Sequence, residues 1–306
     1  MLLALAGGVG AARFLRGLVE VVPPSDITAV VNTGDDFVLH GLSISPDLDT
    51  VTYTLAGAVN PDTGWGLVGE SWAAMDALER YGGQTWFRLG DRDLGTHLYR
   101  TQRREEGAAL SQITAEITSA WGLGLRLVPM SDDRVETRVT VAGDGEIGFQ
   151  DYFVARQHAV PVQAVRFAGA DTARPAPGVL DALAGADRII VCPSNPLVSI
   201  GPIRAVAGME DALVARRGST VAISPIIAGA ALKGPADRMM AELGHEPSVV
   251  GVARLYAHLA STLVIDTADA DRAAAVEAEG VRCVVAPTIM SGPAEAAALA
   301  RVVLAA

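Results

Sequence analysis

The sequence predicts an α/β protein with a doubly wound, mostly parallel sheet, a helical insertion and a β-hairpin. Across the second half of the 306 residues, short apolar segments alternate with segments of helical periodicity, which is the pattern of repeated βαβ units. All four tryptophans lie between residues 60 and 129, where helical periodicity dominates. Residues 132–154 alternate apolar and polar side chains around a Gly-Asp-Gly turn, as the strands of a hairpin do.

The elements follow in chain order from the spacing of apolar and turn-forming residues. Residues 1–6 form an apolar strand, three glycines make a turn, and a helix runs to about residue 22. A second strand at 26–32 leads into a segment of loop formers and acids, and the insertion carries helices at 69–82 and 106–123. Further strands, each followed by a helix, are predicted at 162–169, 187–196, 219–227, 262–266 and 281–290.

This order divides the chain into a nucleotide-binding core and an insertion. The core comprises residues 1–59 and 130–306, and the insertion comprises 60–129. In a parallel sheet the carboxyl ends of the strands meet at one edge, where ligands bind. The loops that follow the predicted strands, among them "GGVGAAR", "NTGDD" and "CPSNP", therefore converge on one site.

Composition limits the possible partners. Half of the residues are hydrophobic, 19% are charged and the net charge is −11, which is typical of a soluble globular protein and excludes general nucleic-acid binding. No apolar run is long enough to span a membrane. Cys192 and Cys283 lie in apolar segments and are expected in the core rather than in a disulfide or zinc site. We expect a cytoplasmic protein.

The glycine-rich loop is a candidate phosphate site because it follows a strand and opens a helix. Its candidate ligand-binding residues are Gly7, Gly8, Gly10 and Arg13. A dinucleotide-binding loop carries a third glycine where Arg13 stands, and an acid at the end of the second strand where Asn32 stands. These departures count against a nicotinamide-dependent oxidoreductase, and a plain tight turn remains the alternative.

A cluster of acids is the candidate metal site. The four carboxylates are Asp35, Asp36, Asp47 and Asp49. Carboxylates placed close together repel one another unless a cation lies between them, and hard oxygen ligands without histidine or cysteine indicate Mg²⁺. Asp47 and Asp49 share one face if the segment is extended. The alternative is a set of solvated turn acids.

Two further features are candidates for a functional role. "CPSNP" presents Ser194 and Asn195 between two prolines, although a well-capped turn explains it equally well. Lys233 is the only lysine in an arginine-rich chain, which indicates either a position that needs a compact ammonium or chance. The sequence holds no Walker A motif, no nucleophile elbow and no evident nucleophile–base pair. The pattern indicates catalysis by positioning and charge, as in Mg²⁺-assisted phosphoryl transfer.

Together these stretches resemble a known family. The stretches are "GGVGAARFLRGL", "VNTGDDFVLHGLSISPDLDT", "FRLGDRD", "CPSNPLVSIGPI" and "SPIIAGAALKGPADRMM". In this order, to about residue 290, they are similar to the 2-phospho-L-lactate transferases, a family that includes the actinobacterial phosphoenolpyruvyl transferases. The resemblance implies a Rossmann-like core with a helical subdomain, a Mg²⁺ requirement and a homodimer.

The resemblance also implies a reaction and assigns residues to it. A phospho-enolpyruvyl or phospho-L-lactyl group would pass from a guanylyl-diphosphate donor to the deazariboflavin Fo, with release of GMP, to make the precursor of coenzyme F-420. Asp49 and Arg88 match the positions that hold the deazaflavin, and Asp49 would orient or deprotonate the attacking hydroxyl. The glycine loop and "CPSNP" would take the donor, with Arg13 and Lys233 at the departing phosphate. A non-catalytic nucleotide-sugar-binding regulator related to the gluconeogenesis factor is the rival interpretation.

Overall fold

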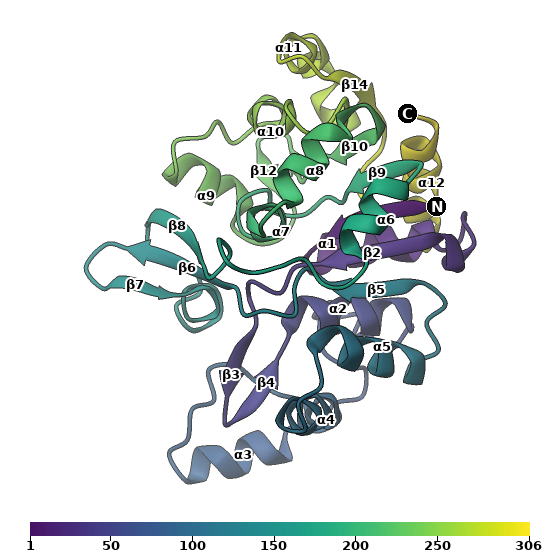
Figure 1. Cartoon of the computed structure of the whole chain (residues 1–306). Coiled ribbons are helices and arrows are strands. Elements are labelled where there is room, and N and C mark those ends of the chain that lie inside the picture. The colour runs from purple at the N-terminus through teal and green to yellow at the C-terminus, as the bar shows by residue number, and fades with distance from the viewer.

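The centre of the molecule is one parallel sheet, and the computed structural model describes all 306 residues. The strand order is β14-β13-β10-β9-β1-β2-β5, and every neighbouring pair is parallel (Figure 1). The strands are β1 (Leu2–Ala6), β2 (Ile27–Val31), β5 (Arg126–Pro129), β9 (Arg188–Val191), β10 (Thr220–Ile223), β13 (Thr262–Ile265) and β14 (Arg282–Val285). The predicted doubly wound α/β fold is confirmed.

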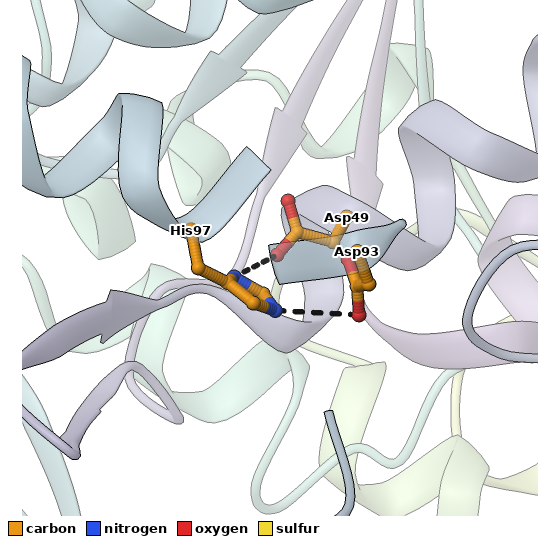
Figure 2. Close-up of side chains that lie close together, drawn as sticks. All are labelled: Asp49, Asp93 and His97. Atoms are coloured by element: carbon orange, nitrogen blue, oxygen red, sulfur yellow. Dashed lines mark ion pairs between the residues drawn. The ribbon is translucent and has the colours of Figure 1, made fainter. Parts of the chain in front are cut away.

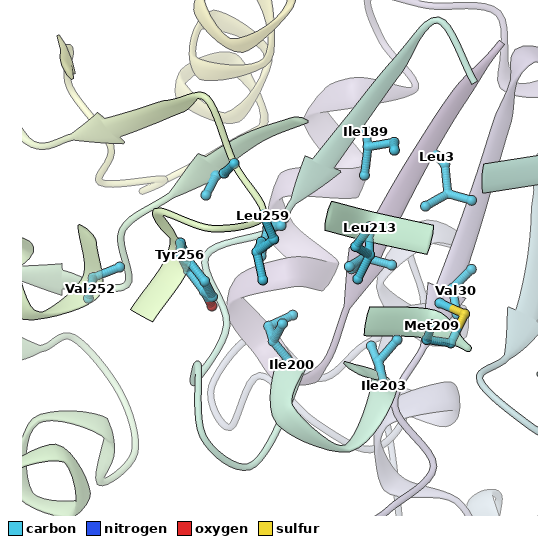
Figure 3. Packing of buried hydrophobic residues seen from close by; sticks show 14 of the residues in the cluster. Leu3, Val30, Ile189, Ile200, Ile203, Met209, Leu213, Val252, Tyr256 and Leu259 are labelled. Carbon is cyan, nitrogen blue, oxygen red and sulfur yellow. The ribbon is translucent and has the colours of Figure 1, made fainter. Parts of the chain in front are cut away.

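Helices cover both faces of this sheet, as the alternation of side chains along β1 requires. Leu3 and Leu5 face the core drawn in Figure 3, beneath α6 (Val179–Gly185), α7 (Ile200–Ala205), α8 (Met209–Ala215) and α10 (Val249–Tyr256). Leu2 and Ala4 face the second core, beneath α1 (Gly8–Leu18), α2 (Pro46–Leu55) and α12 (Pro293–Ala305). The sheet is therefore buried on both sides, and its polar groups gather at its ends.

Three small antiparallel sheets surround the main one. They are β3 (Phe37–Leu39) with β4 (Leu42–Ile44), β6 (Glu136–Val141) with β7 (Gly145–Gly148) and β8 (Val162–Ala168), and β11 (Ile226–Ile227) with β12 (Ala230–Ala231). The hairpin predicted within 132–154 is confirmed as β6–β7. The strand predicted at 162–169 also forms, but its expected place in the parallel sheet is wrong, because β8 pairs antiparallel with β6.

The insertion contains three helices, α3 (Ala73–Arg80), α4 (Asp93–Glu105) and α5 (Leu110–Ala120). In Figure 1, α3, α4 and the β3–β4 hairpin extend away from the main sheet. The hairpin, although it precedes residue 60, packs on α4 through β4. At the other end of the range, residues 126–129 form β5 of the main sheet. The division at 60–129 stays a prediction.

The remaining elements differ from the sequence pattern in several places. The first helix ends at Leu18. The helix expected after the strand at 187–196 is divided into α7 and α8, with Gly208 at φ +82° between them. The pattern did not predict α2, α4 or α10. The other short helices are η1 (Pro24–Asp26), η2 (Asp151–Ala155), η3 (Arg217–Ser219), α9 (Ala236–Glu242), η4 (Thr267–Arg272) and α11 (Ala273–Ala278). None of the helices has the length and apolar character needed to cross a membrane.

Candidate functional site

A cavity of about 510 Å³ opens beside the carboxyl ends of the central strands. It brings together nearly all of the residues that the sequence singled out, from segments that are far apart in the chain. Of the predicted site residues, every one except Asp36 lines it: Gly7, Gly8, Gly10, Arg13, Asp35, Asp47, Asp49, Arg88, Ser194, Asn195 and Lys233. The predicted convergence of strand-end loops is therefore what the structure shows.

The glycine loop is shaped by its neighbours. Gly8 has φ +69°, a conformation that side chains rarely adopt. A Cβ on Gly10 would lie 2.3 Å from the carbonyl oxygen of Pro193, so only glycine lets the "CPSNP" loop approach α1. Ser194 completes this contact by donating a hydrogen bond of 2.9 Å to the Gly7 carbonyl. The glycines thus fix two loops against each other at the wall of the cavity.

Asp47 and Asp35 form a buried acidic pair beside this loop. Asp47 accepts a hydrogen bond of 2.9 Å from the Asn32 side chain, and both carboxylates are less than a tenth exposed. Burial raises the pKa of Asp47 to about 6, and burial together with the Asp47 carboxylate raises the pKa of Asp35 well above its usual range. Asp35 Oδ1 is buried without a hydrogen-bond partner. Oxygen ligands in this state fit a hard divalent cation.

Asp49 lies in a different environment, although it is only two residues from Asp47. Arg100 donates hydrogen bonds to it from both terminal guanidinium nitrogens, from Nη2 to Oδ1 and from Nη1 to Oδ2 at 3.1 Å. His97 lies between Asp49 and Asp93, with its ring nitrogens 3.7 Å and 3.3 Å from their carboxylates (Figure 2). Burial raises the pKa of Asp49 against the opposing effect of Arg100. We call Asp49, Asp93, His97 and Arg100 the buried ion-pair network.

The two acids do not share a face, because the condition for that, an extended segment, is not met. Pro46 begins α2, so Asp47 and Asp49 stand in the first turn of a helix. Residues two apart on a helix point in different directions. Asp47 faces the glycine loop, and Asp49 faces α4.

The other predicted residues make contacts within the protein. Asp36 does not line the cavity; it accepts a hydrogen bond of 2.6 Å from Ser45, and burial raises its pKa to about 7. Asn195 Oδ1 accepts a hydrogen bond of 2.9 Å from the backbone of Leu197, which holds its own turn. Lys233 Nζ lies 3.5 Å from the Thr63 carbonyl and forms no ion pair. Its ammonium therefore faces the cavity without a counter-charge.

The insertion supplies an aromatic wall. The Arg88 guanidinium lies over the Trp72 ring, 4.7 Å from its centroid, and its side chain is half exposed. Trp86 and Phe87 line the cavity near it, and Phe149 and Phe153 line it from the segment around η2. Phe149 and Phe153 stack with centroids 5.6 Å apart. Such walls suit a planar ligand with polar edges.

The sequence did not predict the network of side chains around Asp49. Asp93, His97 and Arg100 occupy positions i, i+4 and i+7 of α4, which place them on one helix face. His97 and Arg100 are each 2% exposed. A polar stripe at helical spacing in "DLGTHLYR" is the one signal that could have indicated them.

Comparison with known proteins connects this site to a family. The family model described as 2-phospho-L-lactate transferase CofD matches residues 2–289. The chain belongs to this family. It is 48% identical over 99% of its length to a Kitasatospora aureofaciens protein named phosphoenolpyruvate transferase, 97% of which is covered. A protein of the same name from Streptomyces griseus is 47% identical, with 98% of this chain and 96% of that protein covered.

Among solved structures, the fold is similar to the Bacillus halodurans protein BH3568, described as a member of the UPF0052 family. The TM-score is 0.65 at 15% identity, and the match covers 99% of this chain and 98% of the other. At this identity the likeness concerns the fold alone. The transferase family membership rests on the sequence comparisons.

Proposed function

We propose that this member of the 2-phospho-L-lactate transferase family transfers a phospho-enolpyruvyl group from its guanylyl-diphosphate donor to the deazariboflavin Fo. The products are GMP and the dehydro form of coenzyme F-420-0, and the phospho-L-lactyl donor is the alternative substrate. The observation that carries the proposal is the single cavity that joins a glycine loop, a buried acidic pair and an aromatic wall. The name shared by the relatives favours the enolpyruvyl donor.

The two sides of the cavity suit the two substrates. Arg13 and Lys233, on the glycine-loop side, line the cavity without ion-pair partners and can bind an anionic donor. Arg88 and the aromatic side chains on the other side can hold a planar deazaflavin. Asp49 stands between α2 and α4 with its carboxylate fixed by Arg100. The substrates would meet where these two sides join.

The buried acidic pair supports a Mg²⁺ requirement. Asp35 and Asp47 would hold the ion, because Asp35 Oδ1 is buried without a partner and no basic side chain neutralises the pair. Asp49 fits this role less well, since both of its oxygens already bind Arg100. Mg²⁺ bound to this pair would supply charge neutralisation for a diphosphate.

In the transfer, the terminal ribityl hydroxyl of Fo attacks the phosphorus that bears the three-carbon acid. A new P–O bond forms to Fo, the bond to the bridging oxygen breaks, and GMP leaves with that oxygen. Asp49 accepts the hydrogen bond of the attacking hydroxyl and orients it, since its carboxylate is held rigidly. The same carboxylate takes up the hydroxyl proton as the new P–O bond forms. Arg13 and Lys233 bind the departing phosphate. Positioning and charge supply the catalysis.

A product assay tests the proposal. Purified protein, Mg²⁺ and Fo are mixed with the guanylyl-diphosphate derivative of enolpyruvate or of lactate, and mass spectrometry measures GMP and the phosphodiester. We expect product from the enolpyruvyl donor. Product from the lactyl donor alone would change the assigned acid, and the absence of product from both, with Fo binding intact, would contradict the proposed reaction.

A further inference from the structure

A buried acid outside the cavity holds one of the loops that line it. Asp269 belongs to η4, which follows β13, and it is only 7% exposed. It does not line the cavity. Asp269 Oδ2 accepts a hydrogen bond of 2.9 Å from the backbone N–H of Ala228, which lies 41 residues away in the sequence. No step of the proposed reaction uses this carboxylate.

Ala228 stands in the turn of the β11–β12 hairpin. Ile227 pairs with Ala230, so a turn of two residues joins the strands. Ala228 and Gly229 both have positive φ, +49° and +79°, as the type I′ turn of a two-residue hairpin requires. Asparagine, aspartate or glycine is usual at the first of these positions, because a Cβ makes the left-handed conformation costly. Support for the alanine comes from outside the hairpin, where the Asp269 carboxylate binds its N–H.

The same hairpin carries Lys233 to the cavity. All residues from Ala231 to Ala236 line it, directly after the turn and its second strand. Strands β11 and β12 have two residues each, and a hairpin this short has little stability of its own. Its place therefore depends on contacts with the rest of the protein. The Lys233 ammonium adds little to them, since its polar contact is with the Thr63 carbonyl at 3.5 Å.

We propose that Asp269 is a positioning residue for Lys233. By fixing the turn of the hairpin, it holds the Lys233 ammonium at the wall of the cavity, where an anionic group of a substrate binds. The role of Lys233 rests on the proposed function, whereas the link from Asp269 to the hairpin rests on the hydrogen bond and the left-handed turn. Loss of the carboxylate should let the turn relax, and with it the segment that carries the lysine.

The single lysine of the chain allows a direct measurement of this segment. A lysine-specific protease can cut only after Lys233, which is exposed, and the cleavage rate follows local opening. Asp269→Ala should speed the cleavage about fivefold, the change expected when one hydrogen bond is lost. Asp269→Asn should be cut at the wild-type rate, because an amide oxygen can still accept the Ala228 N–H.

Asp271→Ala is the matched control, since Asp271 is an exposed acid of the same η4 whose side chain forms no hydrogen bond or ion pair. It should be cut at the wild-type rate. An arginine-specific protease measures opening elsewhere in the chain, and its rate should be the same for all variants. Unchanged lysine cleavage in Asp269→Ala, equal acceleration in Asp271→Ala, or equal acceleration at the arginines would overturn the proposal.

A double-mutant cycle tests whether Asp269 acts through Lys233. Calorimetric titration of GDP with Mg²⁺ should show binding about tenfold weaker in Lys233→Ala and about threefold weaker in Asp269→Ala. The double variant should bind no more weakly than Lys233→Ala, because no ammonium is left to position. A loss of about thirtyfold, the product of the two effects, would contradict the proposal. Since the cleavage assay needs no ligand, a protein that bound no GDP but showed Asp269-dependent cleavage would contradict the proposed function alone.

Discussion

Asp47 and Asp49 are two residues apart in one helical turn, yet they belong to opposite electrostatic regions. The region of Asp47 and Asp35 contains two buried carboxylates and no basic side chain. The region of Asp49 contains Arg100, which binds both carboxylate oxygens, and His97 beyond it. The first region has no counter-charge within the protein, and the second is neutralised from within.

This difference assigns the two acids different roles. A buried carboxylate without a cation is costly to the fold, and such costs are tolerated where a ligand relieves them. A buried carboxylate with a bidentate guanidinium is a fixed structural and orienting group. Under the proposed function, the same helix would offer one carboxylate to a metal and another to a substrate hydroxyl, and the three predictions below test that separation.

Arg100→Leu should have the largest effect, on stability. The substitution leaves Asp49 buried without its partner, and breaking a buried pair in this way costs about 3–5 kcal/mol of unfolding free energy. Chemical denaturation of both proteins measures the difference. Arg103→Leu is the control, because Arg103 lies on the same helix and its ion pairs with Glu106 and Glu116 are partly exposed. It should cost less than about 1 kcal/mol; equal losses in the two variants would remove the distinction between the regions.

Asp47→Asn should weaken Mg²⁺ binding without weakening the fold. Mutation of a residue that hydrogen-bonds to a metal ligand typically lowers metal affinity by about 10–100-fold. Loss of the ligand itself should therefore lower the Mg²⁺ affinity by about 100-fold. Thermal unfolding without Mg²⁺ should be unchanged or improved, since a repelling carboxylate is removed. Titration of Mg²⁺ in the presence of GDP measures the affinity.

Asp36→Asn is the control for that measurement, because Asp36 does not line the cavity. Its Mg²⁺ affinity should stay within about twofold of the wild type. If Asp36→Asn lost most of its Mg²⁺ affinity while Asp47→Asn kept the wild-type affinity, the metal site would not lie beside the glycine loop.

The sequence predicted the fold where apolar patterns were strong. Residues 2–6 and 27–31 are continuous apolar strands, and the glycine turn between β1 and α1 carried a clear signal. The segment 46–55, "PDLDTVTYTL", was predicted as loop because threonine and aspartate are poor helix formers. Its proline and its two acids in the first turn are helix-start signals that could have corrected this.

The sequence predicted which residues gather at the site, but not which of them pair with one another. Strand-end loops converge in any doubly wound sheet, so the gathering of Asp35, Asp47 and Ser194 follows from topology. The pairing of Asp49 with Arg100 joins residues 51 positions apart, through a helix that the pattern did not predict. This pairing depends on how the insertion packs against α2. The periodicity within one segment carries no information about how two segments pack together.

The smallest expected effect is a pH dependence of stability that arises from the buried aspartates. Burial raises the pKa of Asp36 to about 7 and of Asp47 to about 6 in the folded protein, whereas unfolded aspartate titrates near 3.9. Between about pH 4 and pH 7 the folded state therefore holds protons that the unfolded state releases, so the unfolding free energy falls as pH rises.

Thermal unfolding from pH 5 to pH 8 measures this slope. Asp36→Asn should flatten it by about 1.4 kcal/mol for each pH unit between pH 5 and pH 7, and each kcal/mol corresponds to about 2–4 °C in Tm. Added Mg²⁺ should raise the Tm more at pH 8 than at pH 5, because only ionised carboxylates bind it well. A Mg²⁺ effect that is independent of pH would place the ion on groups other than the buried acids. Asp49 of the buried ion-pair network should add to the slope in the same direction, because burial raises its pKa despite the opposing effect of Arg100.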